Sequence, residues 1–375
     1  MSILTEKAPS FVREIAPYRA GKPAAELVRE LGLNPETVVK LASNENPLGL
    51  GEKAKVAIAQ AALDLGRYPD ANGFSLKRKL SERHGVAAEQ ITLGNGSNDI
   101  LELAAKAFLK AGSNSVFSQY AFAVYPLATQ GCGAQAKVVP ALNYGHDLDA
   151  FLATIDENTR VVFVANPNNP TGTFLTEKQL LAFLEKAPSD VLIVLDEAYN
   201  EFLETDQQYD ATQWITRFPN LLVSRSFSKA YGLAGLRVGY SVSSSEVADL
   251  MNRVRQPFNV NSIALAAAEA ALDDAAFLKK TFELNREGRA VLTQGLQALG
   301  LEVLPSAGNF VLVKVGTADN AGALVFDALQ RRGVIVRPVG NYGLPQWLRI
   351  SVGLPAENAR LLAEMPHALA VLDQA

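Results

Sequence analysis

The sequence predicts an α/β protein whose larger part is a mainly parallel sheet between helices. In the middle of the chain, short apolar runs alternate with helix-like segments, and polar residues follow directly after several of these runs. Runs rich in Val, Leu and Ile are typical of strands buried on both faces, and their alternation with helices is typical of a parallel sheet. Ligands bind at the carboxyl ends of such strands.

The expected elements follow one another in a simple order. Strands are predicted at residues 160–165, 191–195, 221–224 and 237–242, with a helix at 176–186 between the first two. From about residue 261 an Ala-rich helical stretch begins, and residues 285–299 are also helical in pattern. A strand at 309–315, a helix at 321–332 and a strand pair at 334–336 and 348–352 complete the chain. This tail predicts a smaller α+β domain.

Composition excludes several classes of protein. The 375 residues include 35 Lys and Arg against 39 Asp and Glu, and 48% are hydrophobic. A net charge of −4 gives no basic face for nucleic acid. With no apolar run of about 20 residues and no cationic, apolar leader at the start, we expect a cytoplasmic protein without a membrane partner. The single Cys132 and three scattered histidines predict neither a disulfide nor a metal site.

The first chemical motif is the segment ITLGNGSND at residues 91–99. It reads as a strand end, a glycine turn and a helix that starts near Ser97 or Asn98. The free N–H groups of a helix start favour a phosphate, and the Ser97 hydroxyl can add to them. The turn is not a dinucleotide fingerprint, because Asp99 stands where the third glycine belongs. An ordinary capped helix is the alternative interpretation.

Lys229 is the most specific signal in the chain. It follows a predicted buried strand, in SRSFSKAYGLAGLRVGY, with hydroxyls at Ser226 and Ser228 and with Arg237 eight residues further on. Most lysines are solvated surface charges. Burial beside other cations, however, lowers the pKa of an ammonium group, and a neutral amine is what a Schiff base with a carbonyl requires. The pattern therefore favours a reactive lysine.

A carboxylate, Asp196, ends the predicted strand VLIVL. Burying it is costly without a cationic or proton-sharing partner, and a helix cap is the simpler interpretation. A pyridinium nitrogen would be such a partner, because an acid beside it keeps the ring protonated and electron-withdrawing. Tyr199, three residues on, could reach a hydroxyl on the same ring.

These motifs together resemble the fold-type I pyridoxal-phosphate aminotransferases, class II subgroup. The matching elements, in order, are Asn169-Pro170-Thr171-Gly172, then Asp196 and Tyr199, then Ser226, Lys229 and Arg237. The resemblance covers about residues 17–352 and implies a seven-stranded sheet in the large domain. It also implies domain boundaries: 46–270 for the large cofactor-binding domain, and 1–45 with 271–375 for the small domain.

The resemblance implies a role for each matched residue. Lys229 would bind the cofactor pyridoxal 5'-phosphate covalently and act as the catalytic acid and base. Asp196 would pair with the pyridine nitrogen, and Asn169 and Tyr199 would bind the phenolic oxygen. The cofactor phosphate would be held by Gly96, Ser97, Asn98, Ser226 and Arg237. An aromatic ring would stack on the cofactor at Phe122, in a segment that also offers Tyr120 and Tyr125.

A finer resemblance is to the histidinol-phosphate aminotransferases. It rests on PY at 17–18, LASNENPLG at 41–49, RYPDANG at 67–73, VIVRP at 334–338 and LRISVG at 348–353. It implies that Tyr18, Asn46, Arg337 and Arg349 bind substrate, the two arginines forming a fork for oxyanions. Tyr68 would reach the cofactor phosphate of a second subunit, so that the active unit is a homodimer.

The implied reaction is a ping-pong exchange between histidinol phosphate and 2-oxoglutarate, with glutamate as a product, in histidine biosynthesis. An aminotransferase for aromatic amino acids and a phosphothreonine decarboxylase of the same fold are the nearest alternatives. A dimer that keeps the fold without catalysis is a third, which the intact set of Lys229, Asp196 and Arg237 disfavours.

Overall fold

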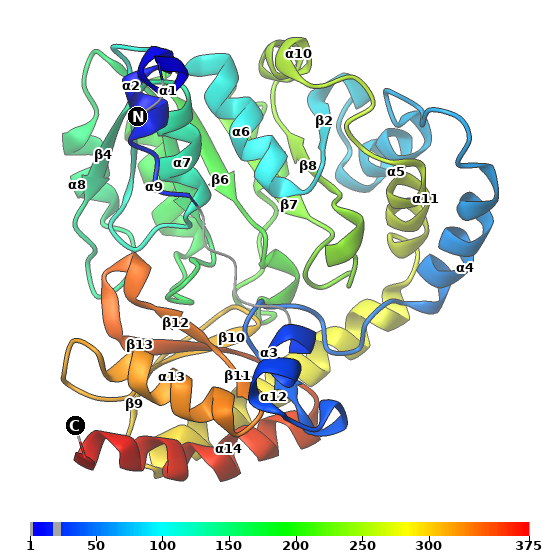
Figure 1. Cartoon of the computed structure of the whole chain (residues 1–375). Helices are drawn as coiled ribbons and strands as arrows, with labels where there is room; N and C mark the ends of the chain where they lie inside the picture. The colour runs from blue at the N-terminus through cyan, green and yellow to red at the C-terminus, as the bar shows by residue number, and fades with distance from the viewer. Residues whose placement is uncertain (1–2, 18–23, 375) are drawn as a thin grey trace.

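The computed structural model describes residues 3–17 and 24–374. Two sheets dominate it (Figure 1). The larger one lies between two layers of helices in the upper part of the view. The smaller one lies below it, with helices α12, α13 and α14 packed on its outer side.

The large sheet has seven strands in the order β2-β8-β7-β6-β5-β3-β4. All neighbours are parallel except β8, which runs antiparallel to β2 and β7. The predicted α/β fold with a mainly parallel seven-stranded sheet is therefore confirmed. The strands are β2 (Ile91–Gly94), β3 (Asn114–Ser118), β4 (Gln135–Val139), β5 (Thr159–Ala165), β6 (Leu192–Asp196), β7 (Leu221–Ser226) and β8 (Gly239–Val242).

Alternation along the strands divides the core between the two helical layers. In β5, Val162 and Val164 pack with one layer, whereas Val161 and Phe163 pack with the other. The first layer comprises α4 (Glu52–Ala61), α5 (Phe74–His84), α8 (Leu148–Thr154), α9 (Glu177–Lys186) and α11 (Ser262–Ala271). The second comprises α6 (Ser97–Phe108), α7 (Val124–Gly131) and α10 (Ser245–Val254).

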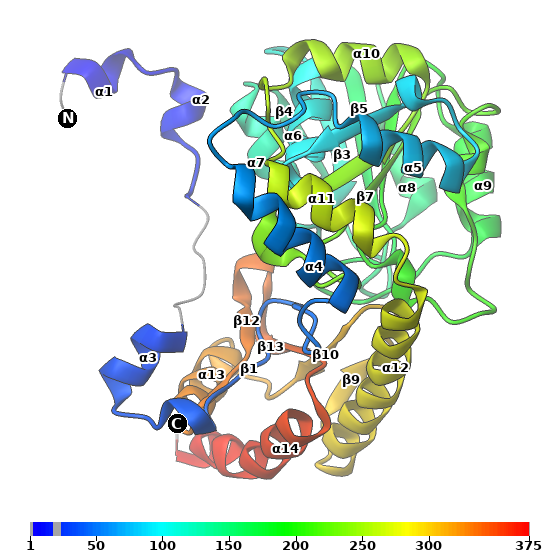
Figure 2. The same cartoon turned by 90° about the vertical axis from the view of Figure 1, so that its right-hand side faces the viewer.

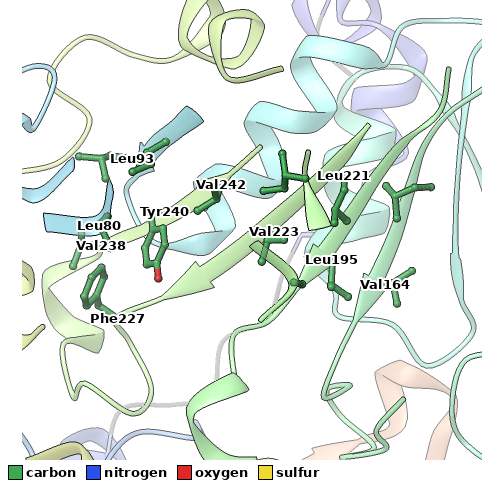
Figure 3. Packing of buried hydrophobic residues seen from close by; sticks show 14 of the residues in the cluster. Leu80, Leu93, Val164, Leu195, Leu221, Val223, Phe227, Val238, Tyr240 and Val242 are labelled. Atoms are coloured by element: carbon green, nitrogen blue, oxygen red, sulfur yellow. The ribbon is translucent and has the colours of Figure 1, made fainter. Parts of the chain in front are cut away.

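Neighbouring strands present matched residues to the first layer. Val164, Leu195, Val223 and Val242 are successive partners in the registers of β5, β6, β7 and β8. Figure 3 shows these four side chains next to one another on one face of the sheet. Each is almost completely buried, so the centre of the sheet is fixed tightly and its strand ends make a rigid platform.

The helical stretch after residue 261 is divided differently from the prediction. Helix α11 ends at Ala271, and α12 (Ala275–Ala298) then runs without a break through residues 281–284. Asp274 makes the division, because its carboxylate accepts a hydrogen bond from Phe277 N and so caps α12. The sequence pattern missed this cap because both flanking segments are strong helix formers.

The small sheet has four antiparallel strands in the order β12-β13-β10-β9. Its strands are β9 (Glu302–Leu304), β10 (Phe310–Lys314), β12 (Arg337–Val339) and β13 (Leu344–Ser351). Val313 and Ile350 face a core shared with α12, α13 (Ala321–Arg331) and α14 (Pro355–Leu369). Leu312 and Trp347 lie in a second cluster with Tyr120 and Tyr144, which belong to the large-sheet part of the chain.

The predicted pair at 334–336 and 348–352 consists of two strands with different partners. Strand β11 (Val334–Ile335) pairs in parallel with β1 (Val39–Lys40), whereas β13 pairs with β10 and β12. Leu41, next to β1, joins the core of the small sheet. The domain boundaries at residues 46 and 270 stay a prediction.

The amino-terminal helices are α1 (Ile3–Lys7), α2 (Ser10–Arg13) and α3 (Ala24–Leu31). In Figure 2, α1 and α2 stand out at the level of the large-sheet part, where α2 contacts α7, and α3 lies at the level of the small sheet. Phe11 approaches Gly133 just after α7. Within the described part of the chain, every helix is too short or too polar to cross a membrane.

Candidate active site

The predicted site residues converge at one edge of the large sheet. Asn169 follows β5, Asp196 ends β6, and Lys229 follows β7; these three strands are parallel neighbours. Arg237 precedes β8, which runs the opposite way, so its start lies at the same edge. Gly96 and Ser97 follow β2, which is antiparallel to β8 and ends there too. The topology thus brings together groups that are more than a hundred residues apart.

Gly96, Ser97 and Arg237 form a cradle for an anion. Gly96 precedes the first residue of α6 with φ 84°, and a Cβ at this position would overlap the Arg237 guanidinium. A Cβ at Gly239 would overlap the Ser97 backbone nitrogen. Both glycines therefore allow the helix start and the cation to approach each other closely. Arg237 Nη1 donates to Ser228 Oγ at 3.3 Å, and Ser226 Oγ accepts from Ser228 N at 3.0 Å.

Asp99, which excluded a dinucleotide fingerprint, turns away from this cradle. Its carboxylate accepts hydrogen bonds from Asn95 N and Asn259 Nδ2, both at 2.8 Å. The acid therefore stabilises the glycine turn. Asn98 is the second residue of α6, and its predicted contact with a phosphate stays a prediction.

Lys229 lies at the centre of the site, half-buried. Its Nζ donates to Ser43 O at 3.2 Å and lies 5.9 Å from the centre of the Tyr199 ring. Burial lowers the pKa of Lys229 to about 8, and Arg349 adds to this effect. The amine is therefore far easier to deprotonate than an ordinary lysine, as a Schiff-base lysine must be.

Asp196 is buried, and only one of its two carboxylate oxygens accepts a hydrogen bond. Its Oδ2 accepts a hydrogen bond from the Tyr125 hydroxyl at 2.8 Å, whereas its Oδ1 has no hydrogen-bond partner in the described chain. Burial raises the pKa of Asp196 to about 6, although the Tyr125 hydrogen bond opposes this shift. A positively charged ring nitrogen would satisfy the open oxygen.

A second set of polar groups lies beside the lysine. Arg349 Nη1 donates to Asn169 Oδ1 at 2.5 Å, and its Nη2 donates to Ala42 O at 2.8 Å. The Tyr199 hydroxyl accepts a hydrogen bond from Asn44 Nδ2 at 3.0 Å. Arg349 thereby connects β13 of the small sheet to the loop after β5.

The three aromatic candidates for stacking lie in different surroundings. Tyr125 is fully buried, stacked on Phe163 at 4.8 Å, and bonded to Asp196. Tyr120 pairs with Tyr144 at 5.9 Å. Phe122 is half-buried and touches Tyr125 edge-on at 6.0 Å. Since Tyr125 is enclosed, its part is to support Asp196, and stacking by Phe122 stays a prediction.

Four residues predicted to bind substrate or a second subunit's cofactor lie in different settings. Tyr18 falls outside the described residues. Arg337 is the register partner of Arg349 on the neighbouring strand. Tyr68 is 83% exposed and stacks on Phe258 at 4.8 Å. Asn46 is buried, where its amide nitrogen donates to Ala230 O and Thr281 Oγ1 and its Oδ1 accepts from Leu48 N.

Sequence reasoning missed Asn44 and the role of Tyr125. The hydrogen bonds place Asn44, two residues before Asn46 in the same motif, against Tyr199. In the structure its positive φ of 53°, which Asn tolerates more readily than most residues, distinguishes Asn44 from Asn46, but the motif itself gave no signal of this. Tyr125 gave no such signal, because only the fold brings α7 behind β6.

These observations fit the cofactor that the sequence predicts. The cradle of Gly96, Ser97 and Arg237 suits a phosphate group, the open oxygen of Asp196 suits a protonated ring nitrogen, and Lys229 has the lowered pKa that an imine requires. Among the described residues, no group of three His, Cys, Asp or Glu side chains could hold a metal ion.

Comparison with known proteins identifies the family. The sequence pattern of the family described as "Aminotransferase class I and II" matches residues 36–365. The chain belongs to this family. The chain is therefore an aminotransferase, as the sequence predicted.

Individual relatives agree with this assignment. The aminotransferase is 61% identical to histidinol-phosphate aminotransferase 1 of Cupriavidus pinatubonensis, over 96% of each chain. It is also 61% identical to histidinol-phosphate aminotransferase 2 of Ralstonia nicotianae, over 98% of each chain. Its fold matches the crystal structure of histidinol-phosphate aminotransferase from Sinorhizobium meliloti in complex with pyridoxal-5'-phosphate, with a TM-score of 0.90, 30% identity and 98% of each chain covered.

The lowered pKa of Lys229 predicts how this aminotransferase reacts with an aldehyde. Attack needs the unprotonated amine, so the rate at which apoprotein and pyridoxal phosphate form the visible imine band should rise with pH and level off above about 8. The rate for Nα-acetyl-lysine, whose only amine is the side-chain one, should keep rising under the same conditions toward the ordinary lysine pKa. If the rate for the apoprotein reached no plateau below pH 10.5, the ordinary pKa of lysine, the lowered pKa of Lys229 would be contradicted.

The hydrogen bond between Tyr125 and Asp196 gives a second prediction. In Tyr125→Phe the pKa of Asp196 should rise further, and pyridoxal phosphate should dissociate about tenfold more readily, as expected for a lost hydrogen bond to a charged group. Absorbance titration of apoprotein with the cofactor measures this. Tyr240→Phe, which removes a buried hydroxyl bonded to His84 instead, is the matched control. Equal affinities in the two variants would remove Tyr125 from this role.

Proposed function

We propose that the chain is a histidinol-phosphate aminotransferase with pyridoxal 5'-phosphate as its cofactor. It transfers the amino group of L-histidinol phosphate to 2-oxoglutarate in a reversible ping-pong reaction, giving imidazole acetol phosphate and L-glutamate. The observation that carries the substrate assignment is the pairing of Arg337 on β12 with Arg349 on β13, because Arg349 is one of the charges that act on Lys229. The names of the 61%-identical relatives support the same reaction.

The chain's own residues divide the work of holding the cofactor. Gly96, Ser97, Ser226 and Arg237 would bind its phosphate, and Asp196 would keep its ring nitrogen protonated. Because Asn169 Oδ1 already accepts from Arg349, the Asn169 amide nitrogen is left to donate to the phenolic oxygen.

Lys229 would move the proton. The bound cofactor supplies an electron sink for the α-carbon of the substrate. Once displaced by the substrate amine, the Lys229 amine would take the proton from the substrate carbon that carries the amino group and would release it to the cofactor carbon that receives that group. Its lowered pKa suits both directions, because the amine then exchanges a proton near neutral pH.

The two arginines suit a doubly charged substrate group. Arg337 and Arg349 are directly opposite in the register of β12 and β13, so their side chains leave the same face of the small sheet. Like charges in this arrangement repel each other, and an anion between them relieves the repulsion. A phosphate in one half-reaction and a carboxylate of glutamate in the other would each serve.

We propose that the active unit is a homodimer and that Tyr68 reaches the cofactor phosphate of the neighbouring subunit. Tyr68 stacks on Phe258, which is itself 41% exposed, and the chain on either side of Tyr68 exposes Leu63, Leu65 and Phe74. Large apolar side chains left exposed in this number are typical of a protein interface. The cytoplasmic location also stays a prediction.

A paired assay tests the proposed reaction. With 2-oxoglutarate as acceptor, kcat/KM for histidinol phosphate should exceed that for phenylalanine at least about tenfold, because phenylalanine lacks the phosphate that the arginines bind. Lys229→Ala should be inactive on both and should lack the visible imine band. A preference for phenylalanine would assign the chain to aromatic amino acids instead, and carbon dioxide released from phosphothreonine would make it a decarboxylase.

Arg337 gives a sharper test of the phosphate contact. Arg337→Ala should lower kcat/KM for histidinol phosphate about 10- to 100-fold, the effect of losing a charged hydrogen bond, and should affect glutamate less because a carboxylate carries a smaller negative charge than a phosphate. Arg331→Ala is the matched control, since Arg331 is an exposed arginine on α13 paired with Asp327. Equal losses for the two substrates would argue against a contact of Arg337 with phosphate.

A further inference from the structure

Asn44 links Tyr199 to the small sheet. It is 1% exposed and has a left-handed backbone with φ 53°. Its side-chain nitrogen donates to the Tyr199 hydroxyl at 3.0 Å, and its Oδ1 accepts from Ser351 Oγ at 3.0 Å. Neither contact follows from the roles proposed above.

The orientation of the Asn44 amide is fixed by a backbone group. Asn44 N donates to Ser351 Oγ at 2.8 Å, so the serine oxygen is already an acceptor. Its single proton is then available for Asn44 Oδ1, which assigns the oxygen end of the amide to Ser351. The nitrogen end must therefore face Tyr199.

This arrangement also fixes the direction of the Tyr199 hydroxyl. A phenol has one proton to donate, and an amide N–H that points at its oxygen cannot accept that proton. The Tyr199 proton is therefore directed to another acceptor. Burial raises the pKa of Tyr199 to about 12, so the proton is present at neutral pH.

We propose that Asn44 is a positioning residue that holds the Tyr199 hydroxyl as a hydrogen-bond donor toward the phenolic oxygen of the cofactor. This inference rests on the proposed function, because it takes pyridoxal phosphate bound at Lys229 as given. The negative charge on the phenolic oxygen stabilises the protonated lysine imine. A hydrogen bond donated to that oxygen reduces this charge and so makes the imine easier to deprotonate. Asn44 therefore lowers the pKa of the imine, acting through Tyr199.

The small sheet holds Asn44 from two adjacent strands. Ser351 ends β13, and Asn309, just before β10, donates from Nδ2 to Asn44 O at 3.0 Å. The register pairs Phe310 with Ser351, so both contacts come from one end of the central strand pair. Tyr199 belongs to the large-sheet part. A change in the position of the small sheet relative to the large one would therefore alter the hydrogen bond from the Tyr199 hydroxyl to the cofactor.

The test is an absorbance titration of the holoenzyme. Asn44→Gly keeps the left-handed backbone without strain and removes the amide. The pKa of the visible imine band should rise by about one unit, a tenfold change in proton affinity. In a Tyr199→Phe background, which lacks the hydroxyl, Asn44→Gly should add nothing further.

Two more variants complete the experiment. Ser351→Ala leaves Asn44 in place but frees its amide to rotate, so it should shift the same pKa in the same direction. Asn143→Gly is the matched control, since Asn143 is an exposed asparagine with φ 50° outside the site, and its titration should equal that of the wild type. Should Asn44→Gly fail to fold, Ser351→Ala decides: no shift in its titration overturns the inference.

The titrating groups around the imine stay the same in every variant except Tyr199→Phe. They are Arg349, Glu45, Arg237 and Asp196 around Lys229, and Arg349, Asp196 and Tyr342 around Tyr199. An unshifted titration in Asn44→Gly with an intact band, or an equal shift in the Tyr199→Phe background, overturns the inference alone. A wild-type holoenzyme without the band would overturn the proposed cofactor, and this inference with it.

Discussion

A carboxylate buried at the end of the central strand determines what the site can bind. Asp196 ends β6, the middle strand of seven, with one oxygen bonded to Tyr125 and the other without a hydrogen-bond partner in the described chain. An ionised carboxylate in this position costs several kcal/mol unless a cation or donor faces it. A ligand with a positively charged nitrogen therefore stabilises the folded strand end as it binds, and cofactor affinity and folding stability are linked.

Residues 42–44 connect the small sheet to the site at the strand ends of the large sheet. Ala42 O accepts from Arg349, Ser43 O accepts from Lys229, and Asn44 donates to Tyr199. The segment is held by β13, because Leu41 O accepts from Ser351 N and Asn44 contacts the Ser351 hydroxyl. Three consecutive residues thus touch three different groups of the site. A small displacement of the segment would change the surroundings of the lysine, the tyrosine and the arginine together.

The sequence predicted the large sheet, and singled out Asp196 and Lys229, for physical reasons that the structure makes plain. Strands such as β5 and β6 are buried on both faces and read as continuous apolar runs, and Asp196 and Lys229 stand out because charges rarely follow such runs. The antiparallel direction of β8 and the pairing of β11 with β1 depend on contacts distant in sequence. The choice between Asn44 and Asn46 depends on backbone angles, and a motif of two asparagines does not reveal them.

An ion pair between Arg225 and Glu197 joins the ends of β6 and β7 on the face of the sheet opposite to the predicted cofactor groups. Glu197 follows Asp196 and Arg225 precedes Ser226, so the alternation of side chains puts them away from the cofactor groups. Arg225 Nε donates to Glu197 at 3.0 Å, and its Nη2 lies 3.2 Å from Asp210. Glu197 is fully buried, so losing Arg225 would leave an unpaired buried charge, whereas the pair together ties β6 to β7. The ion pair thus fixes the spacing between Asp196 and Ser226, which are predicted to contact opposite ends of the cofactor.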